Sequence, residues 1–566
     1  MYGIYGTYNP SLTYPTEAVE GRVMYVQDMV IAQKTLDKFL KDKPFVQTDI
    51  YAYALEGVIL NRKQLEQQYG IEWPAALYEK EGETFFNLLR GSFHGIFYDK
   101  RQRTCLIFTD HIGSKPLFYH ISGNKVFFDC DIQRLGQTTQ LYTADLLYAY
   151  SMLTFGYSPT EHTPIENIFR LQAGEYLRIS PTEVRKITYH HFSNIPRTNN
   201  PQDVIAQMDS LFRQALQRIL DKNKEYGLKN LMPLSAGLDS RMTVMVAHQL
   251  ETNIETFTFS QTNYFDQNYA YEISKHLGIA WHFVPLDNGE YLHNIDSAVQ
   301  HSNMQLQYAG PAQVEFGMSR VPHSQTGVIA TGMLGDIIVN SFMPQKPYYF
   351  GLGAFSKTLL SRLATIVPKD FMTQYSDADM YYIMVRGLMF ANLGSPSIFQ
   401  QFTESCSPFA DVDFMEYCLQ LPHYMRWNYS IYDQWILQCY PHIAQWRHNG
   451  KEIIGHRPTQ VVIAGRTMPI QDVIGRLFRY CLNKFHLGNN YKLEKEQSMN
   501  PLDSWLAENK NLKDDWNNYF ASHLPLIKKS LLQKDILHLF TQGNAVEQIS
   551  VLTYLSIVHQ LGLQFD

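Results

Sequence analysis

A short stretch near the middle of the chain carries the residue types best suited to phosphate chemistry. Residues 231–240 read Leu-Met-Pro-Leu-Ser-Ala-Gly-Leu-Asp-Ser. Gly237 lets the backbone approach a phosphate, and the hydroxyls of Ser235 and Ser240 can donate to its oxygens. A carboxylate beside a phosphate repels it unless a divalent cation lies between them, so we interpret Asp239 as a Mg²⁺ ligand.

The elements around this stretch are those that would position such a site. Residues 230–234 are predicted to end a buried strand, residues 235–240 to form a tight turn, and residues 241–250 to form an amphipathic helix. The free N–H groups and the dipole at a helix N-terminus favour an anion. The alternative is an ordinary turn in which Asp239 is simply an acid favoured by the dipole. The Gly-Lys-Ser/Thr ending of the Walker motif is missing.

The second half continues with alternating strands and helices. Strands are expected at residues 255–259, 281–285 and 327–330, and helices at 202–222 and 271–277. Such alternation predicts a parallel, doubly wound sheet with its ligand at the carboxyl ends of the strands.

The first half has a different pattern. Short aromatic or β-branched segments, bounded mostly by Gly, Asp or Asn, predict strands near residues 3–6, 21–26, 50–55, 95–98, 104–109, 117–119 and 125–128. Helices are expected near 28–40 and 61–69. Dense strands with few helices predict packed antiparallel sheets with helices outside. Residues 193–201 are rich in Pro and Asn, which indicates a linker.

Composition excludes several classes of partner. The 566 residues carry a net charge of −6 with 45% apolar residues, which gives no electrostatic case for nucleic acid or anionic membrane. No secretory signal is expected at the N-terminus, and the apolar segment 549–563 is too polar to span a bilayer. The six cysteines form no C-x-x-C pair, which favours reduced thiols and a cytoplasmic protein.

The central stretch resembles the pyrophosphate loop, Ser-Gly-Gly-Leu-Asp-Ser, of the ATP pyrophosphatases, and of asparagine synthetase and its relatives in particular, with Ala236 in place of the first glycine. Residues 91–99, 109–119 and 171–177 are similar to segments of the N-terminal glutaminase domain of that family. The resemblance implies an α/β fold of two parts. These are an N-terminal-nucleophile (Ntn) hydrolase-like αββα sandwich over 1–194 and, after a linker at 195–201, a parallel α/β domain over 202–566 of the adenine nucleotide alpha-hydrolase-like, PP-loop type.

The same resemblance implies a set of site residues. Thr331-Gly-Met-Leu-Gly-Asp336 is similar to the family's Ser-Gly-Glu-Gly-x-Asp-Glu motif, so Asp336 is the expected second ligand of Mg²⁺ beside Asp239. Arg447 or Lys451 could neutralise phosphate charge, the alternative being a solvated helix end. The residues expected to bind ATP are Leu234, Ser235, Ala236, Gly237, Leu238, Ser240, Phe259, Ser260, Thr331 and Gly332.

Two departures from the family bear on the nitrogen source. The family's glutaminase uses a cysteine at position 2, where this chain has Tyr2, and its glutamine-holding Asn-Gly-Glu corresponds to Glu56-Gly57-Val58. A phenol cannot replace a thiolate nucleophile, so the glutaminase is expected to be inactive. Met333 stands where the family has a glutamate near the ammonia, and it cannot carry a proton.

The sequence therefore predicts an ATP-dependent amide ligase that forms an acyl-adenylate and releases pyrophosphate. Its substrate would be a small-molecule, sugar-acid or peptide carboxylate, and neither the amine donor nor the oligomeric state is identified. Two alternatives remain open: a macrolactam synthetase of the lasso-peptide type, and a non-catalytic scaffold.

Overall fold

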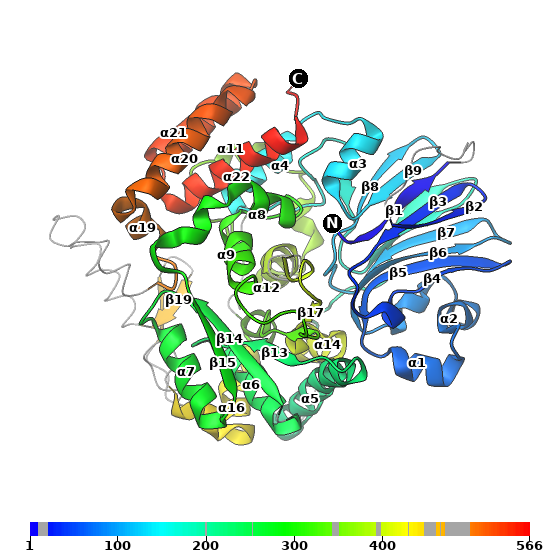
Figure 1. Ribbon diagram of the computed structural model, residues 1–566, viewed down its shortest axis with the longest axis horizontal. Helices are drawn as coiled ribbons and strands as arrows, with labels where there is room; N and C mark the ends of the chain where they lie inside the picture. The colour runs from blue at the N-terminus through cyan, green and yellow to red at the C-terminus, as the bar shows by residue number, and fades with distance from the viewer. Residues whose placement is uncertain are drawn as a thin grey trace.

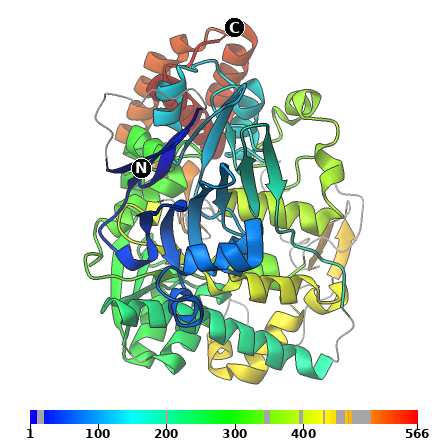
Figure 2. The ribbon, with the colours of Figure 1, turned by 90° about the vertical axis from the view of Figure 1, so that its right-hand side faces the viewer.

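The structure is a computed structural model that describes residues 1–9, 21–197, 201–251, 253–341, 350–391, 398–427, 430–446, 460–463, 466–469 and 498–565. Two antiparallel sheets lie at one end of the molecule, and the helical remainder lies beside them (Figure 1). Figure 2 shows the sheets from their own side. The expectation of an antiparallel first half and a parallel second half is confirmed.

Each of the two N-terminal sheets has six strands. The first has the order β10-β8-β9-β1-β3-β2 and the second β12-β11-β7-β6-β5-β4. Their bounds are β1 (Gly3–Tyr8), β2 (Arg22–Val26), β3 (Met29–Lys34), β4 (Phe45–Gln47), β5 (Tyr51–Ile59), β6 (Gly91–Asp99), β7 (Thr104–Thr109), β8 (Phe118–Ser122), β9 (Lys125–Asp129), β10 (Phe169–Arg170), β11 (Glu175–Ile179) and β12 (Val184–Thr188).

Alternation along β5 explains why the sheets form a sandwich. Ala52 and Ala54 face the first sheet in a shared apolar core, whereas Tyr51 and Tyr53 face outward. The outward side chains are covered by α1 (Arg62–Tyr69), α2 (Trp73–Glu81) and the 3-10 segment η2 (Gly82–Leu88). Because successive strand residues point to opposite faces, a strand buried on both faces is apolar at nearly every position, and the charged exception in β5 is Glu56.

The helix predicted over residues 28–40 is wrong. Met29–Lys34 is strand β3, which pairs with both β1 and β2, and a 3-10 turn, η1 (Leu40–Asp42), follows after a gap. The run Met-Val-Ile-Ala is buried at every position because β3 lies inside the sheet. A short, wholly buried apolar run carries no periodicity that separates a strand from a helix.

A parallel sheet forms the centre of the second half. Strands β13 (Asn230–Pro233), β14 (Ile254–Ser260) and β15 (Ala280–Pro285) pair in that order, and β16 (Ile329–Ala330) pairs in parallel with β17 (Ser405–Cys406). A bridge from Lys229 to Thr326 sets the chain leading to β16 beside β13. The loops that follow β13 and β16 therefore leave from one edge.

Helices surround this sheet. They are α5 (Pro201–Glu225), α6 (Leu238–Leu250), α7 (Phe265–Leu277), α8 (Ile295–His301), α9 (Ala309–Met318), α10 (Gly335–Val339), α11 (Leu360–Ile366), α12 (Ala378–Tyr381), the π-helix η5 (Tyr382–Ala391), α14 (Val412–Leu419), α15 (His423–Arg426) and α16 (Ser430–Cys439). Two short strands, β18 (Gln460–Ile463) and β19 (Arg466–Pro469), pair with each other.

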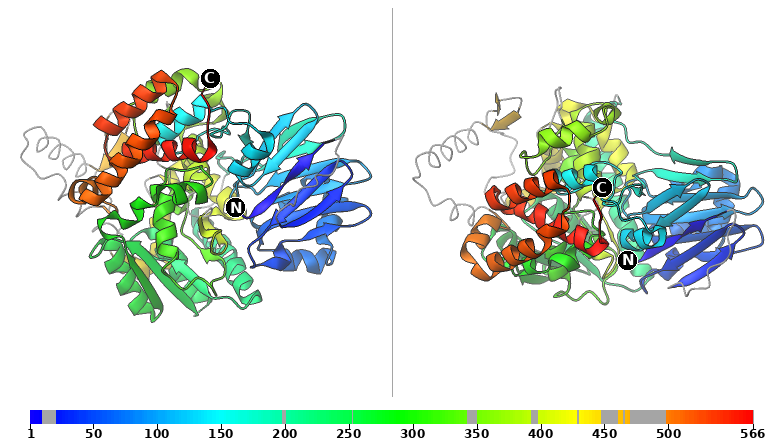
Figure 3. Two further views of the ribbon diagram at one scale, coloured as in Figure 1. Left: turned by 45° about the horizontal axis from the view of Figure 1, so that its top comes forward. Right: turned by 90° about the horizontal axis from the view of Figure 1, so that it is seen from above.

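The chain ends in four helices, α19 (Leu502–Glu508), α20 (Lys510–His523), α21 (Ser530–Gln542) and α22 (Ala545–Leu561). Figure 3 shows α20 and α21, drawn in orange, at the end of the molecule farthest from the sandwich. Helix α22 shares a core with α4 (Leu146–Phe155), which lies between β9 and β10 in the chain. Among the described residues, none of the helices is both long and apolar enough to cross a membrane.

Candidate active site

The turn between β13 and α6 is closed by its own hydroxyl groups. The Oγ atoms of Ser235 and Ser240 lie 2.9 Å apart, and the N–H groups of Ser235 and Gly237 each donate to one of these hydroxyls, at 3.1 Å in both cases. A Cβ on Gly237 would meet little besides the Ser235 hydroxyl, at 3.2 Å. The backbone at Gly237 is therefore open to a ligand, as a phosphate-binding turn requires.

The second acidic loop packs directly on this turn. Leu334 adopts a left-handed φ of 71°, and the N–H of Asp336 donates to Oδ2 of Asp239 at 2.9 Å. A Cβ added to Gly332 would lie 2.6 Å from the Ser240 nitrogen, and one added to Gly335 would lie 2.5 Å from Cγ of Asp239. Two glycines thus let the loops approach closely enough to bring Asp239 and Asp336 together.

Tyr432 of α16 completes the surroundings of Asp239. Its hydroxyl donates to Oδ1 of Asp239 at 2.7 Å, and its ring is fully buried. Withdrawal from water and the neighbouring charge of Asp336 raise the pKa of Asp239, although the bonds from Tyr432 and from the Asp336 backbone oppose that rise. Two buried acids held this close together form a place where a divalent cation is electrostatically favoured.

A cationic side chain, that of Arg386, lies near Asp336. Burial raises the pKa of Asp336, while the charge of Arg386 opposes that rise. Arg386 belongs to η5, and its guanidinium lies over the rings of Phe355 and Phe390 at 4.6 and 3.8 Å. Next to it, a Cβ on Gly387 would touch Ile337 of α10 at 3.4 Å. The structure therefore adds an arginine that the sequence alone did not single out.

The predicted cations Arg447 and Lys451 lie outside the described residues. The residue before them, Trp446, is described, and its carbonyl accepts from Arg241 at 2.8 Å. The other amino group of Arg241 donates to the carbonyl of Ala236 at 2.5 Å. The chain is thus held against the phosphate turn just before Arg447.

The remaining predicted ATP contacts lie along the same sheet edge. Thr331 opens the second loop, and Phe259 and Ser260 end β14, the strand beside β13. Phe259 packs against Gly317 of α9, where an added Cβ would meet its ring at 2.4 Å. Asp266, at the start of α7, accepts from the N–H of Ala236 at 2.6 Å. Leu234 and Leu238 are buried and anchor the turn.

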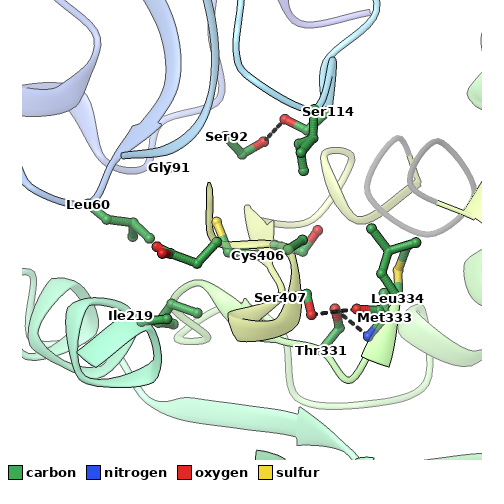
Figure 4. Close-up of a pocket in the computed structure, with 15 residues that line it drawn as sticks. Leu60, Gly91, Ser92, Ser114, Ile219, Thr331, Met333, Leu334, Cys406 and Ser407 are labelled. Atoms are coloured by element: carbon green, nitrogen blue, oxygen red, sulfur yellow. Dashed lines mark hydrogen bonds between the residues drawn. The ribbon is translucent and has the colours of Figure 1, made fainter. Parts of the chain in front are cut away.

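A small cavity of about 40 Å³ separates the second loop from the sandwich. Figure 4 shows Ser92 and Ser114 on the sandwich side, facing Cys406, Ser407 and Met333. The Ser407 hydroxyl donates to the carbonyl of Met333 at 2.7 Å. Met333 therefore lies at the boundary between the two halves, as a methionine with no proton to exchange.

The described residues contain no cluster of three or more His, Cys, Asp or Glu side chains able to hold a metal. Mg²⁺ commonly binds through one or two carboxylates together with substrate phosphates and water. Asp239 and Asp336 provide two carboxylates beside a turn with an open glycine backbone. Tyr432, Arg241 and Arg386 complete the surroundings, and no local sequence pattern marks them because they lie far from the turn or on a helix face.

Comparison with known proteins adds matches in both halves. The family model of the glutamine amidotransferase domain matches residues 41–190, and that of asparagine synthase matches residues 207–349. Asparagine synthetase (glutamine-hydrolyzing) 2 of Bacillus subtilis (strain 168) is 26% identical over 268 residues, which are 44% of this chain and 35% of that protein. Asparagine synthetase (glutamine-hydrolyzing) 1 of the same organism is 24% identical over 245 residues, 42% of this chain and 37% of that protein.

The match therefore spans about a third of the length of these curated relatives. Among solved structures, glutamine phosphoribosylpyrophosphate (PRPP) amidotransferase from B. subtilis, complexed with ADP and GMP, is 10% identical. The alignment covers 64% of this chain and 82% of that chain, with a TM-score of 0.23.

Proposed function

Because this chain belongs to the asparagine synthetase family, we propose that it is an ATP-dependent ligase that joins a carboxylate to an amine. The observation that carries the proposal is the meeting of the two acidic loops. The backbone N–H of Asp336 binds Asp239 at 2.9 Å, although 97 residues separate the two positions. Two acids beside an open glycine turn suit a Mg²⁺-bound polyphosphate, because the cation offsets their repulsion. In a purely structural contact the two buried acids would destabilise the fold.

In the proposed reaction the chain's own groups hold ATP. The hydroxyls of Ser235 and Ser240 and the first-turn N–H groups of α6 would bind phosphate oxygens. Asp239 and Asp336 would hold Mg²⁺, which when bound supplies positive charge to the phosphates. Arg386 adds a fixed positive charge beside Asp336, where negative charge on a leaving pyrophosphate would be stabilised.

The chemistry proceeds in two displacements. An oxygen of the substrate carboxylate forms a bond to the α-phosphorus, and the bond from that phosphorus to the β-phosphate oxygen breaks, which yields an acyl-adenylate and pyrophosphate. The amine nitrogen then bonds to the acyl carbon and loses a proton, and AMP leaves. The acyl substrate is a small acid, a sugar acid or a peptide carboxylate.

Nucleotide analysis tests the proposal. Purified protein incubated with Mg-ATP and a panel of acids should catalyse exchange between ATP and labelled pyrophosphate with one of them, and the complete reaction should yield AMP. Stoichiometric ADP and phosphate would contradict it. Failure to bind Mg-ATP at all would favour the non-catalytic scaffold instead.

A further inference from the structure

Three lysines of the sandwich contact one short segment of the second half, Phe402–Glu404. Lys38 donates from Nζ to the carbonyls of Phe402 at 3.1 Å, His323 at 3.0 Å and Thr326 at 2.9 Å. One ammonium group can make three hydrogen bonds, and Lys38 makes all three to backbone carbonyls across the interface. This arrangement fixes backbone rather than side chains.

The other two lysines bind the carboxylate of Glu404. Nζ of Lys115 lies 2.8 Å from Oε2 of Glu404, and Nζ of Lys43 lies 3.3 Å from Oε1. The side chains of Lys43, Lys115 and Glu404 are exposed by only 0%, 3% and 4%. Burial alone would raise the pKa of Glu404, but the charges of Lys115 and Lys43 hold it below its ordinary value. We call Lys38, Lys43 and Lys115 the lysine clamp.

Glu404 leads directly into the strand that supports the second acidic loop. Its carbonyl accepts from the N–H of Ile329 at 2.9 Å, and the carbonyl of Cys406 accepts from the N–H of Thr331 at 2.9 Å. These are bonds of the β16–β17 pair, and β16 continues into Thr331–Asp336. The hydroxyl of Ser407 then holds the loop at Met333. The clamp is thus linked to the loop of Asp336 by successive hydrogen bonds along β16 and β17 and by the Ser407 hydroxyl.

The clamp also occupies the region that corresponds by resemblance to the glutamine-holding residues. Glu56 pairs with Lys43 at 3.0 Å and accepts from Gln33 at 2.9 Å and from Thr35 at 3.1 Å. The Cε atom of Lys115 lies 2.6 Å from where a Cβ on Gly57 would be. Lys43 thus contacts both Glu56 and Glu404, and Lys115 binds Glu404 from beside Gly57.

We infer that the sandwich acts as a positioning domain, in which the lysine clamp holds β17 and thereby fixes the loop that carries Asp336 against Asp239. The clamp residues touch neither acid, so they are positioning residues. The role of the fixed loop in binding Mg²⁺ rests on the proposed function. The physical link between the clamp and the loop does not, because it requires no nucleotide.

Amide hydrogen exchange on the intact protein tests the link directly. Lys115→Met and Lys38→Met should each speed exchange in peptides covering residues 331–341 by roughly tenfold, since local opening becomes easier by about 1.4 kcal/mol for each factor of ten. Lys38→Arg keeps the charge, so its exchange in these peptides should be as slow as in the wild type. Lys38 is only half-buried, so its variants should fold even if Lys115→Met does not.

Lys222→Met is the matched control. Lys222 is 1% exposed and pairs with Asp42 at 2.7 Å across the same interface, and its second ion pair, at 3.2 Å, is with Glu225 of its own helix α5. It should lower Tm without changing exchange in residues 331–341. Equal exchange in the control and the clamp variants would overturn the inference.

Binding of Mg-ATP provides the second measurement. The half-saturating Mg²⁺ concentration for ATP binding should rise roughly tenfold in Lys115→Met and Lys38→Met and stay within about twofold of wild type in Lys222→Met, because a displaced loop weakens one ligand of the cation. An unchanged Mg²⁺ dependence together with faster exchange would overturn the functional purpose of the clamp. If the wild type binds no Mg-ATP, the proposed function fails, and the exchange experiment still decides whether the clamp holds the loop.

Discussion

Asp239 has a defined orientation before any ligand arrives. One carboxylate oxygen accepts from Tyr432 at 2.7 Å and the other from the backbone of Asp336 at 2.9 Å. Each oxygen keeps a further lone pair for a cation, since an ionised carboxylate can accept about four bonds. The side chain is therefore preorganised, and a ligand need not spend free energy to order it.

Substitution of Asp239 by Asn should abolish most of the proposed activity while preserving the fold. Asn keeps the shape and can still accept from Tyr432, but it removes one charge from the cation site and loses the hydrogen bond from the Asp336 N–H, because its amide nitrogen does not accept. Loss of a preorganised electrostatic contact costs about 10²–10³ in rate, measured as pyrophosphate exchange. Asp336→Asn should behave alike, and the double variant should lose less than the sum because both residues serve one site.

An acid outside the site supplies the control for these variants. Asp221 is exposed on α5, so Asp221→Asn should leave exchange and Tm unchanged. Folded Asp239→Asn protein with full pyrophosphate exchange would show that Asp239 is only a helix-start acid, whose loss costs about 0.3–1 kcal/mol of stability.

At the level of elements, the two loops meet only because glycine stands at their contact. Gly335→Ala would place a Cβ 2.5 Å from Cγ of Asp239, so one loop must move. We expect activity to fall at least tenfold, because small displacements of positioned groups cost up to about 10² in rate. The change in Tm should be modest.

Gly310→Ala in α9 is the matched control, since nothing lies within 4 Å of its Cβ position. It should be neutral or slightly stabilising. Equal activity of the two variants would disprove the steric argument.

The sequence predicted the elements whose pattern lies within one short stretch of the chain. The phosphate turn, α6 and the three parallel strands follow from a strand, small residues and an amphipathic pattern within 60 residues of each other. The error at residues 28–40 arose because Met29–Lys34 is buried on both faces, so its pattern does not alternate. The roles of Arg447 and Lys451 stay predictions.

Contacts between distant segments were not predictable from one sequence. Tyr432 lies 193 residues from Asp239, and Glu404 is an ordinary acid in the sequence until Lys43 and Lys115 surround it. Neither residue belongs to a periodic pattern that reports its partner. Such positions become identifiable only when the fold brings the two halves together.

On the scale of the whole molecule, the buried ion pairs at the interface should make stability depend on pH. Glu404 has a pKa below its ordinary value of 4.5 in the folded protein. Its contribution to stability is therefore present above pH 4.5 and is lost as pH falls through the lowered pKa. The Tm difference between wild type and Glu404→Gln should narrow below about pH 4.5.

Calorimetry at several pH values measures this difference, with Glu183→Gln as the control. Glu183 pairs with Arg185 on the surface, where the side chains are 37% and 64% exposed, and exposed pairs contribute little to stability. If the Tm difference between wild type and Glu404→Gln stays constant down to about pH 3, the charge of Glu404 does not stabilise the interface as proposed.

If the sandwich positions the loop and the second half binds ATP, the protein should not hydrolyse glutamine. Tyr2 supplies no thiolate, Glu56 is held by Lys43 and Gln33, and Lys115 lies over Gly57. Ammonia release from glutamine should not exceed a protein-free blank, and Tyr2→Cys should not revive it because Glu56 and Lys115 keep these positions. Tyr2→Phe should leave any ligase activity unchanged. Glutamine-dependent ammonia release by the wild type at enzyme-like rates would show that the sandwich still supplies nitrogen, and its role would then extend beyond holding the loop of Asp336.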